Sequence, residues 1–161
     1  MIRMVSSHEM ELLARQINQA HRTAVQEELA AAGLSEVGHP MLLTILESSG
    51  KGGPGCQCHA QRELAELLHI SPAAVANSLK SLERGGYIHR QPSTGDARRN
   101  LVLLTDKGAA AVKDCYRAFE RVSGRMLEGF SEEEREQLLA FRRRMLKNLS
   151  KQDHHSNEQE G

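Results

Sequence analysis

Residues 61–105 read QRELAELLHISPAAVANSLKSLERGGYIHRQPSTGDARRNLVLLT and contain, in order, the patterns of two helices and a hairpin. The first helix is amphipathic, since apolar residues recur at helical spacing while charged residues occupy the other side. After a short turn at 69–71, Ser71 can cap the next helix with its hydroxyl. Pro72 suits the first helical position because no backbone donor is needed there. The apolar face of the first helix is expected to hold Leu64, Ala65, Leu67 and Leu68.

The second helix has one apolar face and one small, polar face. Val75, Leu79 and Leu82 are expected to point to the core, and Gly85 with Gly86 ends the helix. The opposite face has no acidic or bulky aliphatic residue, so it can approach base edges in a DNA groove without steric or charge conflict. The residues expected on this exposed face are Ala73, Ala74, Asn77, Ser78, Lys80 and Ser81.

A basic hairpin follows the second helix. Residues 87–91 predict a short strand and residues 101–104 its apolar return, with the tip between them. Arg98 and Arg99 beside the tip can meet phosphates or enter a narrow minor groove, and Asp96 can hold Arg98 in a bidentate pair. A hairpin whose charges are merely solvated is the alternative. The whole pattern predicts a mostly α fold with a small β-hairpin wing, a winged helix-turn-helix core flanked by long helices.

The segment resembles the DNA-binding region of the MarR (multiple antibiotic resistance regulator) family of bacterial transcription factors. The resemblance covers about residues 8–150. It departs from the family at residues 48–59, a loop that is longer and richer in glycine than the family's short connection. The motifs that carry the resemblance are RELA at 62–65, SPAAV at 71–75, LERGGYI at 82–88, DAR at 96–98 and LTDKG at 104–108.

The resemblance implies an obligate homodimer in which the second helix of the motif enters the major groove and a wing arginine reaches the neighbouring minor groove. By position, the residues that face the major groove are Ser71, Pro72, Ala73, Ala74, Asn77 and Lys80. Asp96, Arg98 and Arg99 take the place of the wing. Ser78 and Arg90 complete the expected DNA-binding set, because Ser78 is expected on the exposed helix face and Arg90 belongs to the same basic stretch.

The rest of the chain predicts long helices within a single domain, residues 1–150, followed by a disordered tail at 151–161. Dimerisation helices at about 8–34 and 105–150 are expected to flank the DNA-binding region at 40–104. A chain of 161 residues cannot bury the apolar stripes of both terminal segments in its own core, so a second subunit is expected to cover them. A monomeric helical bundle is the alternative.

Composition and motifs exclude several classes of protein. The formal net charge is +0, yet basic residues outnumber acidic ones between positions 80 and 99, so a neutral total can hide a basic face. No apolar run approaches ~20 residues and no secretory leader opens the chain, so we expect a cytoplasmic protein without a membrane span. The formal G-x-G-x-x-G at 50–55 follows a helix rather than a strand, and no other catalytic motif is found, so we expect no enzyme.

These patterns together predict a sequence-specific transcriptional regulator that binds an inverted repeat in double-stranded DNA as a homodimer. The resemblance favours a repressor that a small-molecule effector releases from a pocket between the first, second and fifth helices. A winged-helix module that binds protein instead of DNA is the alternative. The candidate effector contacts are His21, Arg22, His39 and Met41. Histidines that merely complete the core are the simpler interpretation of such positions.

The cysteines leave a sensor role open. Cys56, Cys58 and His59 cluster in the glycine-rich loop, and thiolate with imidazole suits zinc or copper(I), although a closed zinc site needs a fourth ligand. Oxidation to a disulfide is a second interpretation, and inert cysteines in a reducing cytoplasm are a third. No motif requires a cofactor, and a metal ion is kept only as this alternative. Cys115 lies on an apolar helix and is expected in the core.

Overall fold

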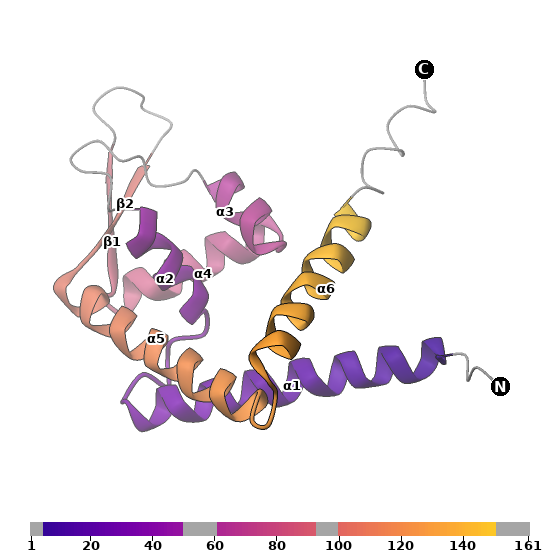
Figure 1. Ribbon diagram of the computed structural model, residues 1–161. Helices are drawn as coiled ribbons and strands as arrows, with labels where there is room; N and C mark the ends of the chain where they lie inside the picture. The colour runs from indigo at the N-terminus through magenta and orange to yellow at the C-terminus, as the bar shows by residue number, and fades with distance from the viewer. Residues whose placement is uncertain (1–4, 50–60, 93–99, 151–161) are drawn as a thin grey trace, which may run out of the picture. The chain divides into compact units, whose positions relative to one another are not determined.

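A computed structural model describes residues 5–49, 61–92 and 100–150 of the chain (Figure 1). The described part is mostly helical with one antiparallel two-stranded hairpin, which confirms the predicted fold class. The elements in order are α1 (Ser7–Ala31), α2 (Pro40–Ser49), α3 (Gln61–Leu68), α4 (Pro72–Arg84), β1 (Ile88–Pro92), β2 (Asn100–Leu104), α5 (Asp106–Met126) and α6 (Glu132–Ser150).

The chain divides into two compact units, Met1–Val122 and Ser123–Gly161. The first unit contains the winged helix-turn-helix, and the second contains the last turn of α5 and all of α6. A single domain over residues 1–150 stays a prediction. The tail at 151–161 lies outside the described residues.

Three helices of the first unit end in the same backbone motif. After α1 and α4 the chain turns through Gly33 and Gly86, whose φ angles of 78° and 79° are positive. After α3 the equivalent position is His69, with φ 52°. There the Ile70 N–H donates to the Ala65 carbonyl oxygen at 3.1 Å, the long hydrogen bond of a Schellman motif. A histidine therefore occupies a position that favours glycine, at the turn between α3 and α4.

The core of the first unit joins the C-terminal half of α1 to α2, α3, α4, the hairpin and α5. Each large aliphatic side chain that it buries contributes about 1.5–3 kcal/mol. Cys115 is buried, as predicted, and burial raises the pKa of its thiol to about 11. The largest fully buried side chains are Tyr87, Leu29, Leu42, Leu43, Leu64, Ile88, Val37, Val75 and Cys115.

One prediction for the core is wrong. Leu67, assigned to the apolar face of α3, is 57% exposed, whereas Leu64 and Ala65 are buried and Leu68 packs against the core. At 3.6 residues per turn, the buried face centres between Leu64 and Ala65, and Leu67 lies well to one side of it. Helical spacing alone placed Leu67 with its neighbours because it follows Leu64 by three positions.

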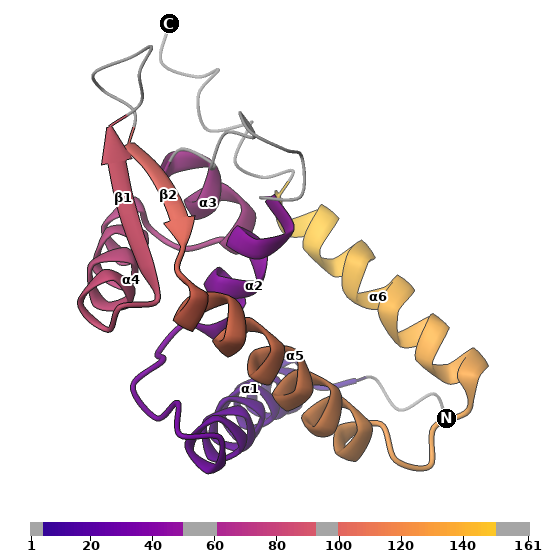
Figure 2. The ribbon, with the colours of Figure 1, turned by 90° about the vertical axis from the view of Figure 1, so that its left-hand side faces the viewer.

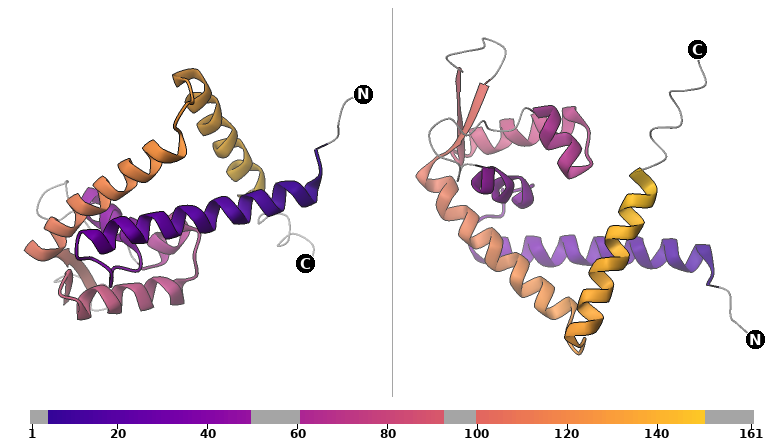
Figure 3. Two further views of the ribbon diagram at one scale, coloured as in Figure 1. Left: turned by 90° about the horizontal axis from the view of Figure 1, so that it is seen from below. Right: turned by 45° about the horizontal axis from the view of Figure 1, so that its top comes forward.

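Helix α5 lies alongside the C-terminal part of α1, as Figures 2 and 3 show. Ala118 and Val122 of α5 share the core with Val25 and Leu29 of α1. On the surface above this contact, an Arg121 guanidinium nitrogen lies 3.0 Å from a Glu28 carboxylate oxygen. The first unit thus consists of a helix pair, α1 and α5, joined to a winged-helix region, defined here as α2, α3, α4, β1 and β2.

The second unit begins with a turn that local side chains specify. The Ser131 N–H donates to Glu134 Oε2 at 2.8 Å, and the Glu134 N–H donates to Ser131 Oγ at 3.2 Å, so the two residues form a capping box. The Arg135 guanidinium donates to the carbonyl oxygens of Leu127 and Phe130. No residue of α6 is buried. Among the described residues, none of the helices is long and apolar enough to cross a membrane.

Candidate nucleic-acid interface

The start of α4 is fixed by two side chains. Ser71 precedes the helix in an extended conformation, and its Oγ accepts a hydrogen bond from the Ala74 N–H at 3.1 Å. Pro72 occupies the first turn, as predicted. Gln61, the first residue of α3, donates from Nε2 to the Pro72 carbonyl oxygen at 2.9 Å. The N-termini of the two helices are therefore tied together. Gln61 was not among the predicted residues, because only its place at the start of α3 hinted at this contact.

The exposed face of α4 is small, polar and singly basic. Val75, Leu79 and Leu82 are buried, as predicted, and turn the opposite side of the helix to solvent. Ala74 is half-buried at the edge of this face. Because these side chains are small, a binding partner can approach the backbone of α4 closely. The exposed residues of the face are Ser71, Pro72, Ala73, Asn77, Lys80 and Ser81.

Ser78 does not belong to the exposed face, and its assignment there is wrong. It is only 7% exposed, and its hydroxyl donates to the Ala74 carbonyl oxygen at 2.9 Å. Ser78 lies three residues after Val75 and four before Leu82, so it shares their inward side. The bond to the preceding turn satisfies the hydroxyl in the core. We therefore remove Ser78 from the residues that are able to contact DNA.

The hairpin forms the wing of the fold. Strands β1 and β2 pair antiparallel, with Ile88 opposite Leu104 and Arg90 opposite Val102. Ile88 and Val102 are buried, whereas His89 and Gln91 are exposed, and the side-chain nitrogens of these last two lie 3.2 Å apart. The predicted wing residues Asp96, Arg98 and Arg99 lie outside the described residues.

Arg90 lies against the C-terminal part of α4. Its Nε is 3.7 Å from Glu83 Oε2, and only 26% of its side chain is exposed. Its Nε and Nη2 are buried and have no hydrogen-bond partner among the described residues. The arginine thus joins the wing to α4, and its predicted contact with DNA stays a prediction.

The candidate effector contacts belong to α1 and to the start of α2. His21 is half-buried on α1, whereas Arg22, His39 and Met41 are exposed. The three predicted metal or redox residues, Cys56, Cys58 and His59, lie outside the described residues. Elsewhere, within the ranges that the structure describes, no group of three or more His, Cys, Asp and Glu side chains is arranged to hold a metal ion.

A capped helix with a small exposed face, preceded by a short helix and followed by an antiparallel hairpin, defines a winged helix-turn-helix protein. Residues 32–99 match the sequence model of the MarR family. The chain is therefore similar to the MarR family over this stretch, in agreement with the resemblance seen in its motifs.

Two curated relatives illustrate the similarity. The HTH-type transcriptional regulator YdgJ of Bacillus subtilis (strain 168) is 35% identical over 91 residues, which are 56% of each chain. The HTH-type transcriptional regulator BilQ of Clostridium symbiosum (strain WAL-14163) is 31% identical over 88 residues, 55% of this chain and 59% of the relative. The chain therefore spans little more than half the length of these relatives. Both names denote transcriptional regulators and not enzymes.

Solved structures extend the likeness over most of the chain. The S. aureus MepR structure, determined as a complex with DNA, has 28% sequence identity and a TM-score of 0.69, and the match covers 85% of this chain and 94% of MepR. The transcriptional regulator SlyA has 25% identity and a TM-score of 0.71, with 93% and 97% of the two chains covered.

Proposed function

We propose that this chain is a homodimeric transcriptional repressor that binds an inverted repeat in double-stranded DNA and is released by a small-molecule effector. The observation that carries the proposal is the exposed face of α4. It presents Ala73, Asn77 and Lys80 to solvent on a helix whose start is capped and tied to α3. Such a face suits the major groove, since it has a basic group and nothing bulky or acidic.

The proposed DNA contacts fall on two elements. On α4 they are Ser71, Pro72, Ala73, Ala74, Asn77 and Lys80. In the wing they are Asp96, Arg98 and Arg99, with Arg90 at its base. MepR, a relative of similar fold, was solved bound to DNA, which supports the same target class for this chain. Because the proposed target is DNA, we place the protein in the cytoplasm.

Exposed apolar side chains support the proposed homodimer. In the N-terminal half of α1, apolar residues recur at helical spacing and form a stripe. Its members Leu12, Leu13 and Ile17 are exposed in the single chain. Helix α6 exposes Phe141 and Leu149 among other apolar residues, and buries none. A long helix with uncovered apolar residues is stabilised when a partner covers it, and a second copy offers the same stripes for mutual burial. Two copies would place their α4 helices about one turn of DNA apart, ~34 Å.

The effector part of the proposal rests on the similarity to the MarR family and on residues at the start of α2 and in α1. His21 is half-buried, and Met41 exposes its side chain near the beginning of α2. An effector that binds one arrangement of the dimer better by ~1–3 kcal/mol changes DNA affinity 5- to 150-fold. Titration of phenols and aromatic acids into a protein–DNA mixture tests this part, and unchanged DNA affinity across the series contradicts it.

Selection of bound duplexes from a random pool tests the proposed function directly. We expect the full-length protein to enrich an inverted repeat, and its affinity to fall steeply with salt because phosphate contacts release counterions. A winged-helix module that binds protein through an apolar surface would enrich no repeat and would show little salt dependence. The absence of any enriched sequence at low salt therefore overturns the proposal.

A further inference from the structure

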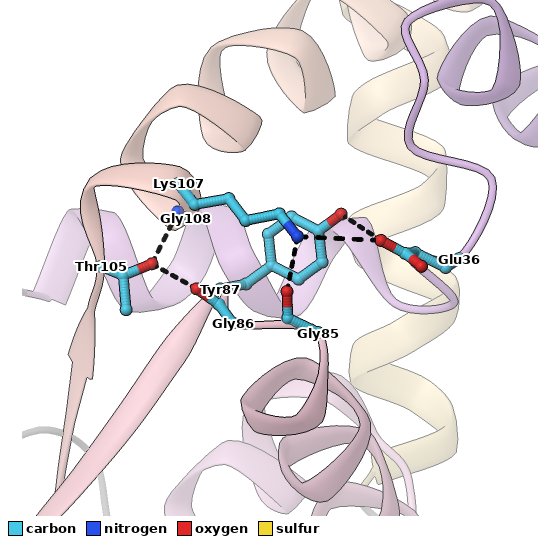
Figure 4. A network of polar contacts seen from close by, with 7 residues as sticks. All are labelled: Glu36, Gly85, Gly86, Tyr87, Thr105, Lys107 and Gly108. Carbon is cyan, nitrogen blue, oxygen red and sulfur yellow. Dashed lines mark hydrogen bonds and ion pairs between the residues drawn. The ribbon is translucent and has the colours of Figure 1, made fainter.

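Three polar side chains from separate segments of the first unit meet at the end of α4 (Figure 4). Glu36 comes from the connection between α1 and α2, Tyr87 directly precedes β1, and Lys107 lies in the first turn of α5. The Tyr87 hydroxyl donates to Glu36 Oε1 at 2.9 Å. Lys107 Nζ lies 4.0 Å from the same oxygen and 4.4 Å from the centroid of the Tyr87 ring. We call these three residues the joint.

Main-chain groups at the end of α4 complete the joint. Lys107 Nζ donates to the Gly85 carbonyl oxygen at 2.6 Å. Thr105 Oγ1 donates to the Gly86 carbonyl oxygen at 2.6 Å, and accepts from the Gly108 N–H at 3.0 Å. The last carbonyls of a helix have no partner within the helix, so Thr105 and Lys107 satisfy two carbonyl groups at the end of α4. The same Thr105 hydroxyl caps α5.

The joint is closely packed, so α5 cannot slide along the residue that precedes β1. The side chain of Tyr87 is only 2% exposed. A β-carbon at Gly108 would overlap the Tyr87 carbonyl oxygen, so the backbones of α5 and of the residue before β1 touch each other. Closely packed contacts of this kind hold one arrangement rather than deforming gradually.

The joint lies where the winged-helix region is connected to the rest of the first unit. One connection is residues 32–39, between α1 and α2, and Glu36 belongs to it. Another is Thr105, between β2 and α5, and Lys107 follows it by two residues. Tyr87 belongs to neither, since it follows α4 within the region itself. A tilt of α4 and the hairpin relative to α1 and α5 must therefore break at least one contact of the joint.

We infer that the joint of Glu36, Tyr87 and Lys107 sets the angle of α4 relative to α1 and α5, and thereby selects the half-site spacing that the dimer accepts in DNA. The inference rests on the proposed function. The three residues act as positioning residues, because they meet at the C-terminal end of α4 and do not belong to its exposed face. Losing one contact lets each α4 adopt a wider range of angles, so a dimer tolerates more spacings.

Binding to three related duplexes tests the inference. The first is the inverted repeat that the full-length wild-type protein selects from a random pool. The other two contain the same half-sites with one base pair added to or removed from the spacer, which displaces a half-site by about 3.4 Å. We expect the wild type to bind the altered duplexes about tenfold more weakly, and Tyr87→Phe to lose less than about threefold, because the joint no longer enforces one spacing.

Matched variants separate positioning from general damage. Glu36→Ala removes the acceptor of the Tyr87 hydroxyl from an exposed position, so we expect the same relaxed spacing, and no further change in the double variant. Tyr116→Phe makes the same chemical change at an exposed site on α5 and should keep wild-type spacing selectivity. Loss of stability alone would weaken binding to all three duplexes equally.

The inference is overturned if Tyr87→Phe and Glu36→Ala discriminate between the duplexes as strongly as the wild type does. If Tyr87→Phe does not fold, Glu36→Ala alone decides. A wild-type protein that selects no duplex at all overturns the proposed function and the inference with it, whereas wild-type binding with unchanged selectivity in the variants overturns only the inference.

Discussion

Arg90 Nε in the first strand of the wing lies 3.7 Å from Oε2 of Glu83 on α4. The pair joins β1 to the C-terminal part of α4, and these are the two elements of the proposed DNA interface. Its arginine is largely buried and has two nitrogens without hydrogen bonds among the described residues, so the carboxylate is the charge that compensates it. We therefore expect the pair to contribute more to the free energy of unfolding than a fully exposed pair on one helix does.

A double-mutant cycle on this pair measures the difference. We expect Glu83→Gln and Arg90→Met to show a coupling of about 0.5–1 kcal/mol in the free energy of unfolding, measured with urea, because each removes the partner of a partly buried charge. The exposed pair Arg62 and Glu66, 3.4 Å apart on α3, serves as the control. Its coupling should stay below about 0.5 kcal/mol. Strict additivity of Glu83→Gln and Arg90→Met contradicts this account.

His69→Gly is expected to stabilise the protein. His69 holds a φ of 52° after α3, a conformation that glycine adopts without steric cost. The expected gain in the free energy of unfolding is about 1 kcal/mol. His89→Gly, on the exposed side of β1, should instead destabilise by about 0.5–1 kcal/mol, since glycine weakens a strand. Thermal and urea unfolding of both variants would refute the account if the two changes had the same sign.

Sequence reasoning succeeded where the structure depends on near neighbours. The predicted cap at Ser71 uses a hydrogen bond to a residue three positions away, so a short pattern contains all the information. The predicted end of α4 at Gly85 and Gly86 follows from the conformational freedom of glycine, since Gly86 has a positive φ. The order of helices and strands was predictable for the same reason.

Sequence reasoning failed where a helix face or a distant contact decides. Ser78 is polar but buried, and Leu67 is apolar but exposed. Which side of a helix is buried depends on the packed core, and residue type alone does not reveal it. The contact of Tyr87 with Glu36 joins residues 51 positions apart, and no periodicity links them. Arg90 was recognised as basic, but its approach to Glu83 depends on how β1 crosses α4.

The buried phenol of Tyr87 should make stability depend on pH in the alkaline range. Burial, together with the hydrogen bond to Glu36, raises the pKa of Tyr87 from 10.0 to about 12. The native state therefore holds this proton more tightly than the unfolded state does. The resulting stability is fully present below pH 10 and is lost as the pH rises to about 12, which amounts to about 2–3 kcal/mol.

Comparison with Tyr87→Phe isolates this effect from other titrating groups. We expect the stability advantage of the wild type over Tyr87→Phe to shrink between pH 9 and pH 12, roughly the range in which the phenol ionises. Tyr116→Phe should follow the wild type across this range, since Tyr116 is exposed. A constant difference between wild type and Tyr87→Phe would show that the phenol is not linked to folding.

Lys80→Ala should weaken DNA binding and reduce its dependence on salt. Lys80 is the exposed basic residue in the middle of α4, and each phosphate contact contributes about 1 to the slope of log affinity against log salt. With two copies in the proposed dimer, the slope should fall by about 2. Lys113→Ala removes the same charge from the exposed side of α5 and should leave the slope unchanged. Equal slopes for Lys80→Ala and the wild type would place Lys80 away from the phosphates.

Phe141→Asp should convert the proposed dimer into monomers. Phe141 lies on α6 with Met145 and Leu149 at four-residue steps, and all three are exposed in the single chain. A carboxylate at this position would be buried without a partner in a dimer, so the variant should sediment as a monomer at concentrations where the wild type does not. Ala140→Asp adds the same charge on the opposite side of α6 and should leave the wild-type sedimentation coefficient unchanged.

A wild type that is itself monomeric, or two variants that dissociate equally, would show that this stripe is not the interface. Monomers of Phe141→Asp that keep wild-type helix content but bind the selected repeat far more weakly would tie the stripe to DNA recognition, because each half-site would then be held by one α4 alone.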